Sequence, residues 1–269
     1  MHGSTGMSGI REPTTQALPL AGRHALVTGG GSGIGLAAAA ALTTVGAAVT
    51  VLGRREAVLH DAVAAGHAAF SIAADVTDEA AMTKAVAAAA GRLGPVLLLV
   101  NAAGAAETAP FHKTTLAMFD RMWRVNVTGA IIATQAALPG MLTAGFGRVV
   151  NIASTASLKG YRYVSAYVAA KHGLLGLTRA LAQEVAGTGV TVNAVCPGFT
   201  DTDLVAESLA RIVARTGRSP EQALAELTRT NPLGRLIRPE EVAASVLYLC
   251  LPAAAGVNGQ ALAVDGGET

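Results

Sequence analysis

Short apolar runs alternate with longer helical segments along most of this chain, and the alternation restricts the folds available to it. The runs are continuously apolar, which is typical of strands in a parallel sheet that is covered on both faces. They lie at residues 24–28, 48–52, 68–73, 96–100, 148–152, 190–195 and 260–264, with helices expected at 33–46, 55–65, 78–92, 115–143, 164–186 and 239–250. Right-handed crossovers between such units build a doubly wound sheet. We therefore expect a single α/β domain, with a seven-stranded parallel sheet and helices on both faces.

Composition supports one large folded domain and narrows the range of partners. Hydrophobic residues make up 51% of the 269 residues and charged residues 14%, which favours a large buried core over disorder. A net charge of +2 gives no field that would select nucleic acid or an anionic membrane. The longest aliphatic run near a strand, 96–100, is too short to span a bilayer. We expect a soluble protein with neither kind of partner.

The cysteines, the histidines and the N-terminus add three expectations. Cys196 and Cys250 cannot form a disulfide framework, which favours a cytoplasmic protein. The six histidines are scattered without ligand spacing, so no metal site is expected. Residues 1–20 lack the apolar core of a signal peptide and are predicted to form a flexible tail before a folded domain at 21–269.

One region interrupts the alternation of strands and helices. Between Pro197 and Pro239 the sequence shows two short helical patterns, near 203–215 and 220–229, and no strand. This region follows the carboxyl end of an expected central strand, where open α/β sheets bind their ligands. We interpret 203–231 as a segment that covers the substrate, with an insertion that serves only packing as the alternative.

A glycine-rich turn follows the first expected strand and opens the first expected helix. The turn consists of Thr28, Gly29, Gly30, Gly31, Ser32, Gly33, Ile34 and Gly35. Glycines let the backbone approach a pyrophosphate, whose charge is favoured at a helix N-terminus. The spacing is TGxxxGxG rather than GxGxxG, and its place in the first β-α unit predicts a dinucleotide site.

The end of the second expected strand bears on the choice of dinucleotide. An acidic residue about 20 positions after the glycines binds the ribose of NAD, whereas an arginine accommodates the 2′-phosphate of NADP. Here Arg54 and Arg55 follow Gly53, with no carboxylate among them. NADP(H) is favoured, and NAD(H) stays open because both arginines could simply be solvated. Asp75, after the third expected strand, is placed to accept a hydrogen bond from the adenine amino group.

Four polar residues form a candidate reactive centre. Tyr167 and Lys171 lie four residues apart and project from one face of an expected helix. A nearby ammonium favours phenolate, and the positive ring of an oxidised nicotinamide would add to this effect. A pKa near 7 would require a shift of about 3 units, roughly 4 kcal/mol. Ser154 follows an expected strand and could hold a carbonyl oxygen, while Asn126 could hold a water near Lys171. Taken singly, the Tyr/Lys pair could be a surface contact and the serine a cap.

Together these motifs resemble the short-chain dehydrogenase/reductases, in their compact single-domain branch, from about Leu20 onward. The resemblance rests on 28–35, Asp75, 101–104, Asn126, Ser154, Tyr167, Lys171, Pro197, Gly198, Thr202 and 264–267. It implies a Rossmann-type fold, catalysis by Asn126, Ser154, Tyr167 and Lys171, and a homotetramer. Beyond the glycine turn, Arg54 and Arg55, the resemblance implies cofactor contacts at Asp75, Val76, Asn101, Ala102, Gly104, Tyr167, Lys171, Pro197, Gly198, Thr200 and Thr202. Two departures are Ala102, where many members carry asparagine, and Ser32, where a basic residue often marks NADP.

The resemblance also implies the reaction, which is hydride transfer between a nicotinamide cofactor and a ketone or secondary alcohol. Similarity to 3-oxoacyl reductases and 3-hydroxyacyl-CoA dehydrogenases favours a 3-oxoacyl or 3-hydroxyacyl thioester. Arg211, Arg215 and Arg218 could attract an anionic carrier such as coenzyme A or an acyl carrier protein. A free ketone, a sugar or a cyclic alcohol is the alternative substrate, and a non-catalytic nicotinamide sensor is the alternative of another class. Small residues on helices 115–143 and 164–186 favour subunit packing, namely Ala130, Ala133, Ala166, Ala169, Ala170 and Gly173.

Overall fold

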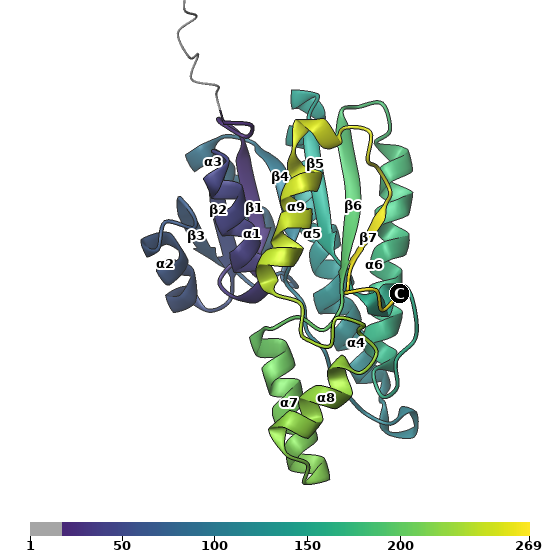
Figure 1. Ribbon diagram of the computed structural model, residues 1–269. Helices are drawn as coiled ribbons and strands as arrows, with labels where there is room; N and C mark the ends of the chain where they lie inside the picture. Colours follow the sequence, from purple (N-terminus) through teal and green to yellow (C-terminus); the bar gives the residue numbers. More distant parts are fainter. Residues whose placement is uncertain (1–17) are drawn as a thin grey trace, which may run out of the picture.

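The computed structural model describes residues 18–269, without the side chain of Arg215, and places seven strands in one parallel sheet (Figure 1). The strands are β1 (His24–Thr28), β2 (Ala48–Gly53), β3 (Phe70–Ala73), β4 (Val96–Asn101), β5 (Gly147–Ile152), β6 (Val190–Pro197) and β7 (Ala261–Val264). Their order in the sheet is β3-β2-β1-β4-β5-β6-β7, so the winding direction reverses between β1 and β4. This is the doubly wound arrangement predicted from the sequence.

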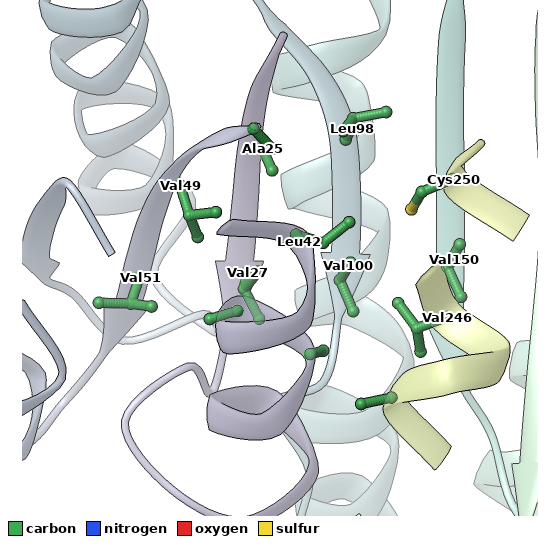
Figure 2. Packing of buried hydrophobic residues seen from close by; sticks show 14 of the residues in the cluster. Ala25, Val27, Leu42, Val49, Val51, Leu98, Val100, Val150, Val246 and Cys250 are labelled. Carbon is green, nitrogen blue, oxygen red and sulfur yellow. The ribbon is translucent and has the colours of Figure 1, made fainter. Parts of the chain in front are cut away.

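Helices cover both faces of the sheet. One face carries α1 (Gly33–Thr44), α2 (Glu56–Ala64) and α9 (Pro239–Cys250); the other carries α3 (Glu79–Leu93), α5 (Gly129–Ala144) and α6 (Ser165–Glu184). Val27 and Val100 pack with Leu42 of α1 and Val246 of α9 (Figure 2). Leu26, next to Val27, belongs to the cluster on the opposite face. Neighbouring residues of one strand are therefore buried on opposite faces, which explains the continuous apolar runs.

The long helix expected at 115–143 is interrupted at Asn126. The structure has α4 (Leu116–Trp123), a π-helical turn at Arg124–Thr128 and then α5. Asn126 donates from Nδ2 to the main-chain oxygens of Met122 and Ala105, each at 2.9 Å. A π turn adds a residue to the helical winding and is frequent at functional sites.

The stretch Leu116–Ala144 is long and apolar enough, by length and composition alone, to cross a membrane. In this fold α5 packs against α3 and β4, and its buried side chains include Ile132, Ala133 and Met141. The apolar character of the α5 part of the stretch is thus accounted for by its place in the core of the domain.

Two helices project beyond the carboxyl ends of the strands, at the lower end of Figure 1. They are α7 (Asp203–Thr216) and α8 (Pro220–Thr228), close to the helical patterns expected at 203–215 and 220–229. Thr200 and Ile237 pair in a parallel bridge at their base, and the Ile237 amide donates to the Phe199 oxygen at 2.9 Å. We call residues 203–231 the cover. The segments that lead into and out of the cover pair at Thr200 and Ile237, and we call this pair the neck.

The expected tail 1–20 falls largely outside the described residues. Of its last three residues, Leu20 is fully buried in the core cluster of α1 and α9. Its amide donates to the Val45 oxygen at 3.0 Å. Leu20 therefore packs with the folded domain.

His24 begins β1 as a buried, uncharged histidine, 1% exposed. Its Nδ1 lies 2.7 Å from the Gly94 oxygen and its Nε2 lies 2.9 Å from the Thr50 hydroxyl. The short contact to a carbonyl places the ring proton on Nδ1. Burial lowers the pKa of His24 below its ordinary value, and the bond to Gly94 only partly opposes this.

We predict that the unfolding free energy falls as the pH drops below about 6.5, the ordinary pKa of histidine. There the unfolded chain binds a proton that folded His24 does not, so the loss is at most about 1.4 kcal/mol per pH unit until the folded pKa is reached. Urea unfolding at pH 8, 6.5 and 5 measures it. His24→Asn should show a smaller slope with pH, and His112→Asn, at an exposed position, should match the wild type. Equal slopes in all three proteins would contradict the prediction.

Candidate active site

A cleft of about 1410 Å³ lies between the carboxyl edge of the sheet and the cover. Most of the residues predicted for cofactor and chemistry line it. They are Gly29, Gly31, Ser32, Gly33, Ile34, Gly35, Arg54, Arg55, Asp75, Val76, Ala102, Gly104, Asn126, Ser154, Tyr167, Lys171, Pro197, Gly198, Thr200 and Thr202. The volume exceeds the several hundred Å³ typical of a site for one small ligand. The cleft is therefore larger than one small ligand requires.

The glycine turn leaves the N-terminus of α1 open to an anion. Ser32 occupies the cap position without a side-chain bond to the helix, and the first turn carries no acidic residue. The first amides of α1 therefore lack a side-chain acceptor. Gly29 has φ of +66°, and a β-carbon there would lie 2.8 Å from the Ala103 nitrogen. The backbone of the turn thus packs directly on the chain that follows β4, and the open amides of α1 could hold a phosphate.

Two residues predicted to contact the cofactor are absent from the lining of the cleft. Thr28 is buried, and its hydroxyl accepts from the Ala102 and Ala103 amides at 3.2 Å. Asn101 is buried too, and donates to Asn151 at 2.8 Å and to the Thr134 hydroxyl at 3.3 Å. Both side chains join elements behind the cleft. They therefore do not point into the cleft toward a cofactor, as expected, but support the neighbouring residues. The resemblance gives the positions of these residues but not the direction of their side chains.

The end of the cleft beside β2 and β3 is positively charged, since Arg54, Arg55 and Arg124 line it. Arg55 donates to the Ser32 hydroxyl at 3.2 Å and lies 3.9 Å from the Asp203 carboxylate at the start of the cover. The amide of Thr77, together with its hydroxyl and the charges of Arg54 and Arg124, lowers the pKa of Asp75 against the opposing effect of burial. Asp75 therefore stays an ionised hydrogen-bond acceptor beside these arginines.

Asn126 ties the π turn to the loop that follows β4. Besides its two donated bonds, Oδ1 accepts weakly from the Ala105 amide at 3.3 Å. A β-carbon on Gly104 would lie 3.0 Å from this oxygen and 3.8 Å from Lys171 Nζ. Glycine at 104 therefore keeps the space between the amide and the ammonium open. With both amide protons committed to the backbone, Asn126 could hold a water only as an acceptor.

Ser154, Tyr167 and Lys171 come together at the centre of the cleft. Ser154 follows β5 and caps a 3₁₀ turn, accepting from the Ala156 amide at 3.0 Å, which leaves its hydroxyl proton free to donate. Tyr167 lies in the first turn of α6, with its phenol beside the Ser154 hydroxyl. Lys171, one turn later and 4% exposed, donates to the Ile152 oxygen at 2.8 Å. The serine is thus both the expected cap and a potential donor.

Burial sets the protonation of the pair. It raises the pKa of Tyr167 above 10, with the Ser154 bond opposing, and lowers the pKa of Lys171 to about 8. In the chain by itself the pKa of Tyr167 is therefore raised, whereas the expected shift toward phenolate relied on Lys171 together with the positive ring of an oxidised nicotinamide. The ammonium lies 5.7 Å from the phenol ring centre and its hydrogen bond goes to Ile152. Below pH 8 both groups carry their protons, so Tyr167 is poised as an acid.

Several residues that sequence reasoning left unassigned also shape the cleft. The Glu107 carboxylate and Arg121 form a two-point ion pair at 2.9 and 2.8 Å on its wall. Cys196 is buried in the same cluster as Tyr167, and burial raises the pKa of its thiol to about 11. Glu268 binds residues of the loop between Ser154 and Tyr167. No local sequence signal marks these contacts, because their partners are distant in the chain.

Comparison with known proteins agrees with this geometry. A family model described as short chain dehydrogenase matches residues 23–212. The chain is 39% identical over 247 residues to 2-(S)-hydroxypropyl-CoM dehydrogenase 3 of Xanthobacter autotrophicus, covering 90% of this chain and 95% of the relative. It is 37% identical over 249 residues to acetoacetyl-CoA reductase of Shinella zoogloeoides, covering 91% and 98%. A crystal structure of a single-residue variant of actinorhodin polyketide ketoreductase with NADPH superposes with a TM-score of 0.87 at 40% identity, covering 91% and 97%.

Gly35 offers a test of the cradle. A β-carbon there would collide with the main-chain oxygen of Gly29, which a flexible side chain cannot relieve. Gly35→Ala should therefore weaken NADPH binding at least about tenfold and lower the unfolding free energy by about 1–3 kcal/mol. Fluorescence titration and urea unfolding measure the two effects.

The matched control is Gly91→Ala, on an open face of α3 with no atom within 4 Å of the added carbon. That change should leave NADPH binding unaltered and stabilise the helix by about 0.5–1 kcal/mol. Normal NADPH affinity in Gly35→Ala would show that the turn does not act as the cradle.

Proposed function

The chain belongs to the short-chain dehydrogenase family, and we propose that it transfers a hydride between NADP(H) and a 3-oxoacyl or 3-hydroxyacyl thioester. The family assignment makes it an oxidoreductase that acts on CH–OH groups. The observation that carries the mechanism is the grouping of a protonated phenol, a free serine hydroxyl and a buried ammonium at the centre of one cleft.

The residues at the adenosine end suit a phosphorylated dinucleotide. The open first turn of α1 would hold the pyrophosphate, and Asp75 would accept from the adenine amino group. Arg54 and Arg55 would bind the 2′-phosphate through charge-assisted hydrogen bonds. When bound, the nicotinamide supplies the hydride to the carbonyl carbon. The ketoreductase whose structure superposes on this chain was solved with NADPH, which supports the same choice.

Three side chains would act on the carbonyl oxygen. Ser154 would donate its free hydroxyl proton and orient the oxygen beside the phenol. Tyr167, neutral at pH 7, would transfer its proton to that oxygen during reduction and recover it during oxidation. Lys171, charged below pH 8, would stabilise the phenolate that remains and bind the ribose of the nicotinamide. Asn126 would fix the loop around Gly104, so that the cleft keeps its shape beside Lys171.

Charge at the substrate end supports an anionic thioester. Arg162 lies on the loop before Tyr167, and Arg211 lies on the cover; both line the cleft and are exposed. Arg218, also in the lining, lies 4.0 Å from Glu226, a distance that leaves it only weakly neutralised. The acetoacetyl-CoA reductase relative is named for a substrate of this chemistry. We infer that the acyl carrier enters between the cover and this loop.

We also propose a homotetramer located in the cytoplasm, although most of the small residues expected to join its subunits pack within the chain. Ala130, Ala133, Ala166 and Ala170 are buried within the chain, whereas Ala169 is exposed and Gly173 is half-buried. Support comes instead from large apolar side chains left exposed near α4. Leu116 is 82% exposed and Trp123 47% exposed, which is unusual unless another molecule covers them.

We predict that the wild type oxidises NADPH in the presence of acetoacetyl-CoA and that Tyr167→Phe lowers kcat at least about 1000-fold. General acid catalysis contributes roughly 10²–10⁴-fold, and phenylalanine keeps the ring but loses the transferable proton. NADPH binding by the variant, measured by fluorescence, should stay within about threefold of the wild type. Near-full turnover in Tyr167→Phe would refute the mechanism. A wild type that binds NADPH but shows no turnover would refute the thioester and redirect the assay to free ketones, sugars and cyclic alcohols.

Arg54→Ala tests the choice of cofactor. Loss of one charge-assisted bond to the 2′-phosphate should raise the KM for NADPH about tenfold, whereas the KM for NADH should change less than about twofold. Initial rates with each cofactor give the ratio. Arg92→Ala, which removes an exposed arginine outside the cleft lining, should change neither value. Equal effects of Arg54→Ala on the two cofactors would exclude a contact between Arg54 and the 2′-phosphate.

A further inference from the structure

Glu268 is the penultimate residue of the chain, yet its side chain is only 1% exposed. A tight turn places it there. Asp265 accepts from the Gly267 and Thr269 amides at 3.0 and 2.9 Å. Gly267 has φ of +92°, a backbone conformation that side chains other than glycine rarely adopt. The chain end therefore folds back against the cleft and delivers a carboxylate into its wall.

One oxygen of this carboxylate joins two separate parts of the cleft. Oε1 of Glu268 accepts from the Tyr161 hydroxyl at 2.8 Å and from the Thr230 hydroxyl at 2.7 Å, and lies 3.1 Å from Lys159 Nζ. Lys159 and Tyr161 belong to residues 157–163, which we call the substrate loop, whereas Thr230 belongs to the cover. All three donors line the cleft. The cover and the substrate loop are thus held by the same buried group.

The substrate loop contains a strained residue two positions after Tyr161, the residue that Glu268 holds. Tyr163 has φ of +69°, a left-handed conformation that costs on the order of 1 kcal/mol or more outside glycine. The Tyr161 hydroxyl also lies 2.7 Å from the Thr155 hydroxyl, next to Ser154. Its ring meets Phe199 edge to face, with 6.2 Å between ring centres. Tyr161 therefore contacts both the residue next to Ser154 and Phe199, which lies in the segment that leads into the cover.

We propose that Glu268 is a positioning residue, which holds the cover and the substrate loop in the arrangement that binds the acyl substrate. The identity of that substrate rests on the proposed function, whereas the tie between cover and loop exists without any ligand. The neck at Thr200 and Ile237 fixes the base of the cover. The bond from Thr230 fixes the end of the cover that follows α8. Removing the buried Glu268 carboxylate is costly, because Lys159 and Tyr161 would lose the acceptor that they share.

Limited digestion with trypsin tests the tie without substrate or turnover. Cleavage in the cover, scored after Arg211 and Arg218, should be at least about fivefold faster in Glu268→Gln than in the wild type. Thr230→Val removes only the bond from the cover and should accelerate the same cleavages. Glu240→Gln, an exposed site at the start of α9, is the matched control and should be cleaved at the wild-type rate. Wild-type cleavage rates in both Glu268→Gln and Thr230→Val would overturn the proposal.

Kinetics test the consequence for the reaction. Glu268→Gln should raise the KM for acetoacetyl-CoA about tenfold while kcat stays within about threefold, because Glu268 lies behind the cleft and does not touch the reacting atoms. NADPH affinity should not change. Faster cleavage outside the cover together with weaker NADPH binding would overturn the proposal, since Glu268 would then serve general stability. A wild type inactive on acetoacetyl-CoA would defeat the proposed substrate, while the digestion would still decide the tie.

Discussion

Burial of both faces of a parallel sheet is the constraint on which the rest of this structure depends. Neighbouring residues of β1 and β4 enter core clusters on opposite faces, so these strands have no face left for polar chemistry. Chemistry is confined to the edge where the strands end. The glycine turn follows β1, Asp75 follows β3 and Ser154 follows β5, all at the carboxyl edge. That single edge therefore carries together the residues proposed to bind the cofactor and those proposed to react.

The features that depend on local pattern could be predicted from the sequence, and those that depend on distant contacts could not. The seven strands follow from continuous apolar runs, and the glycine turn from its place between a strand and a helix. The π turn at Asn126 has no such signature, because one extra residue in a helix leaves the apolar pattern nearly unchanged. Glu268 and Tyr161 are 107 residues apart and meet only through the tertiary fold. Four of the six small residues of α5 and α6 show why composition alone misleads, since Ala130, Ala133, Ala166 and Ala170 pack within one chain.

Protonation at the centre of the cleft illustrates the same limit. Proximity of Lys171 suggested a more acidic Tyr167, whereas burial acts on both groups and favours the neutral form of each. Keeping the Lys171 ammonium charged in this buried position lowers the stability of the fold, which is common where a side chain serves function. The protonated phenol beside the free proton of Ser154 nevertheless suits a site that must give a proton to oxygen. The direction of the shift is thus set by the surroundings of the pair rather than by its spacing.

The paired neck at Thr200 and Ile237 has a consequence for how this architecture can diversify. The chain leaves and re-enters the domain at adjacent points, so the segment between them closes a loop whose length adds little entropic cost. Insertions, deletions or wholesale replacement of the helical hairpin would leave the strand pairing and the phosphate cradle as they are. The sheet with its glycine turn and the cover can therefore vary independently, so that evolution could change the segment proposed to bind the substrate without refolding the domain.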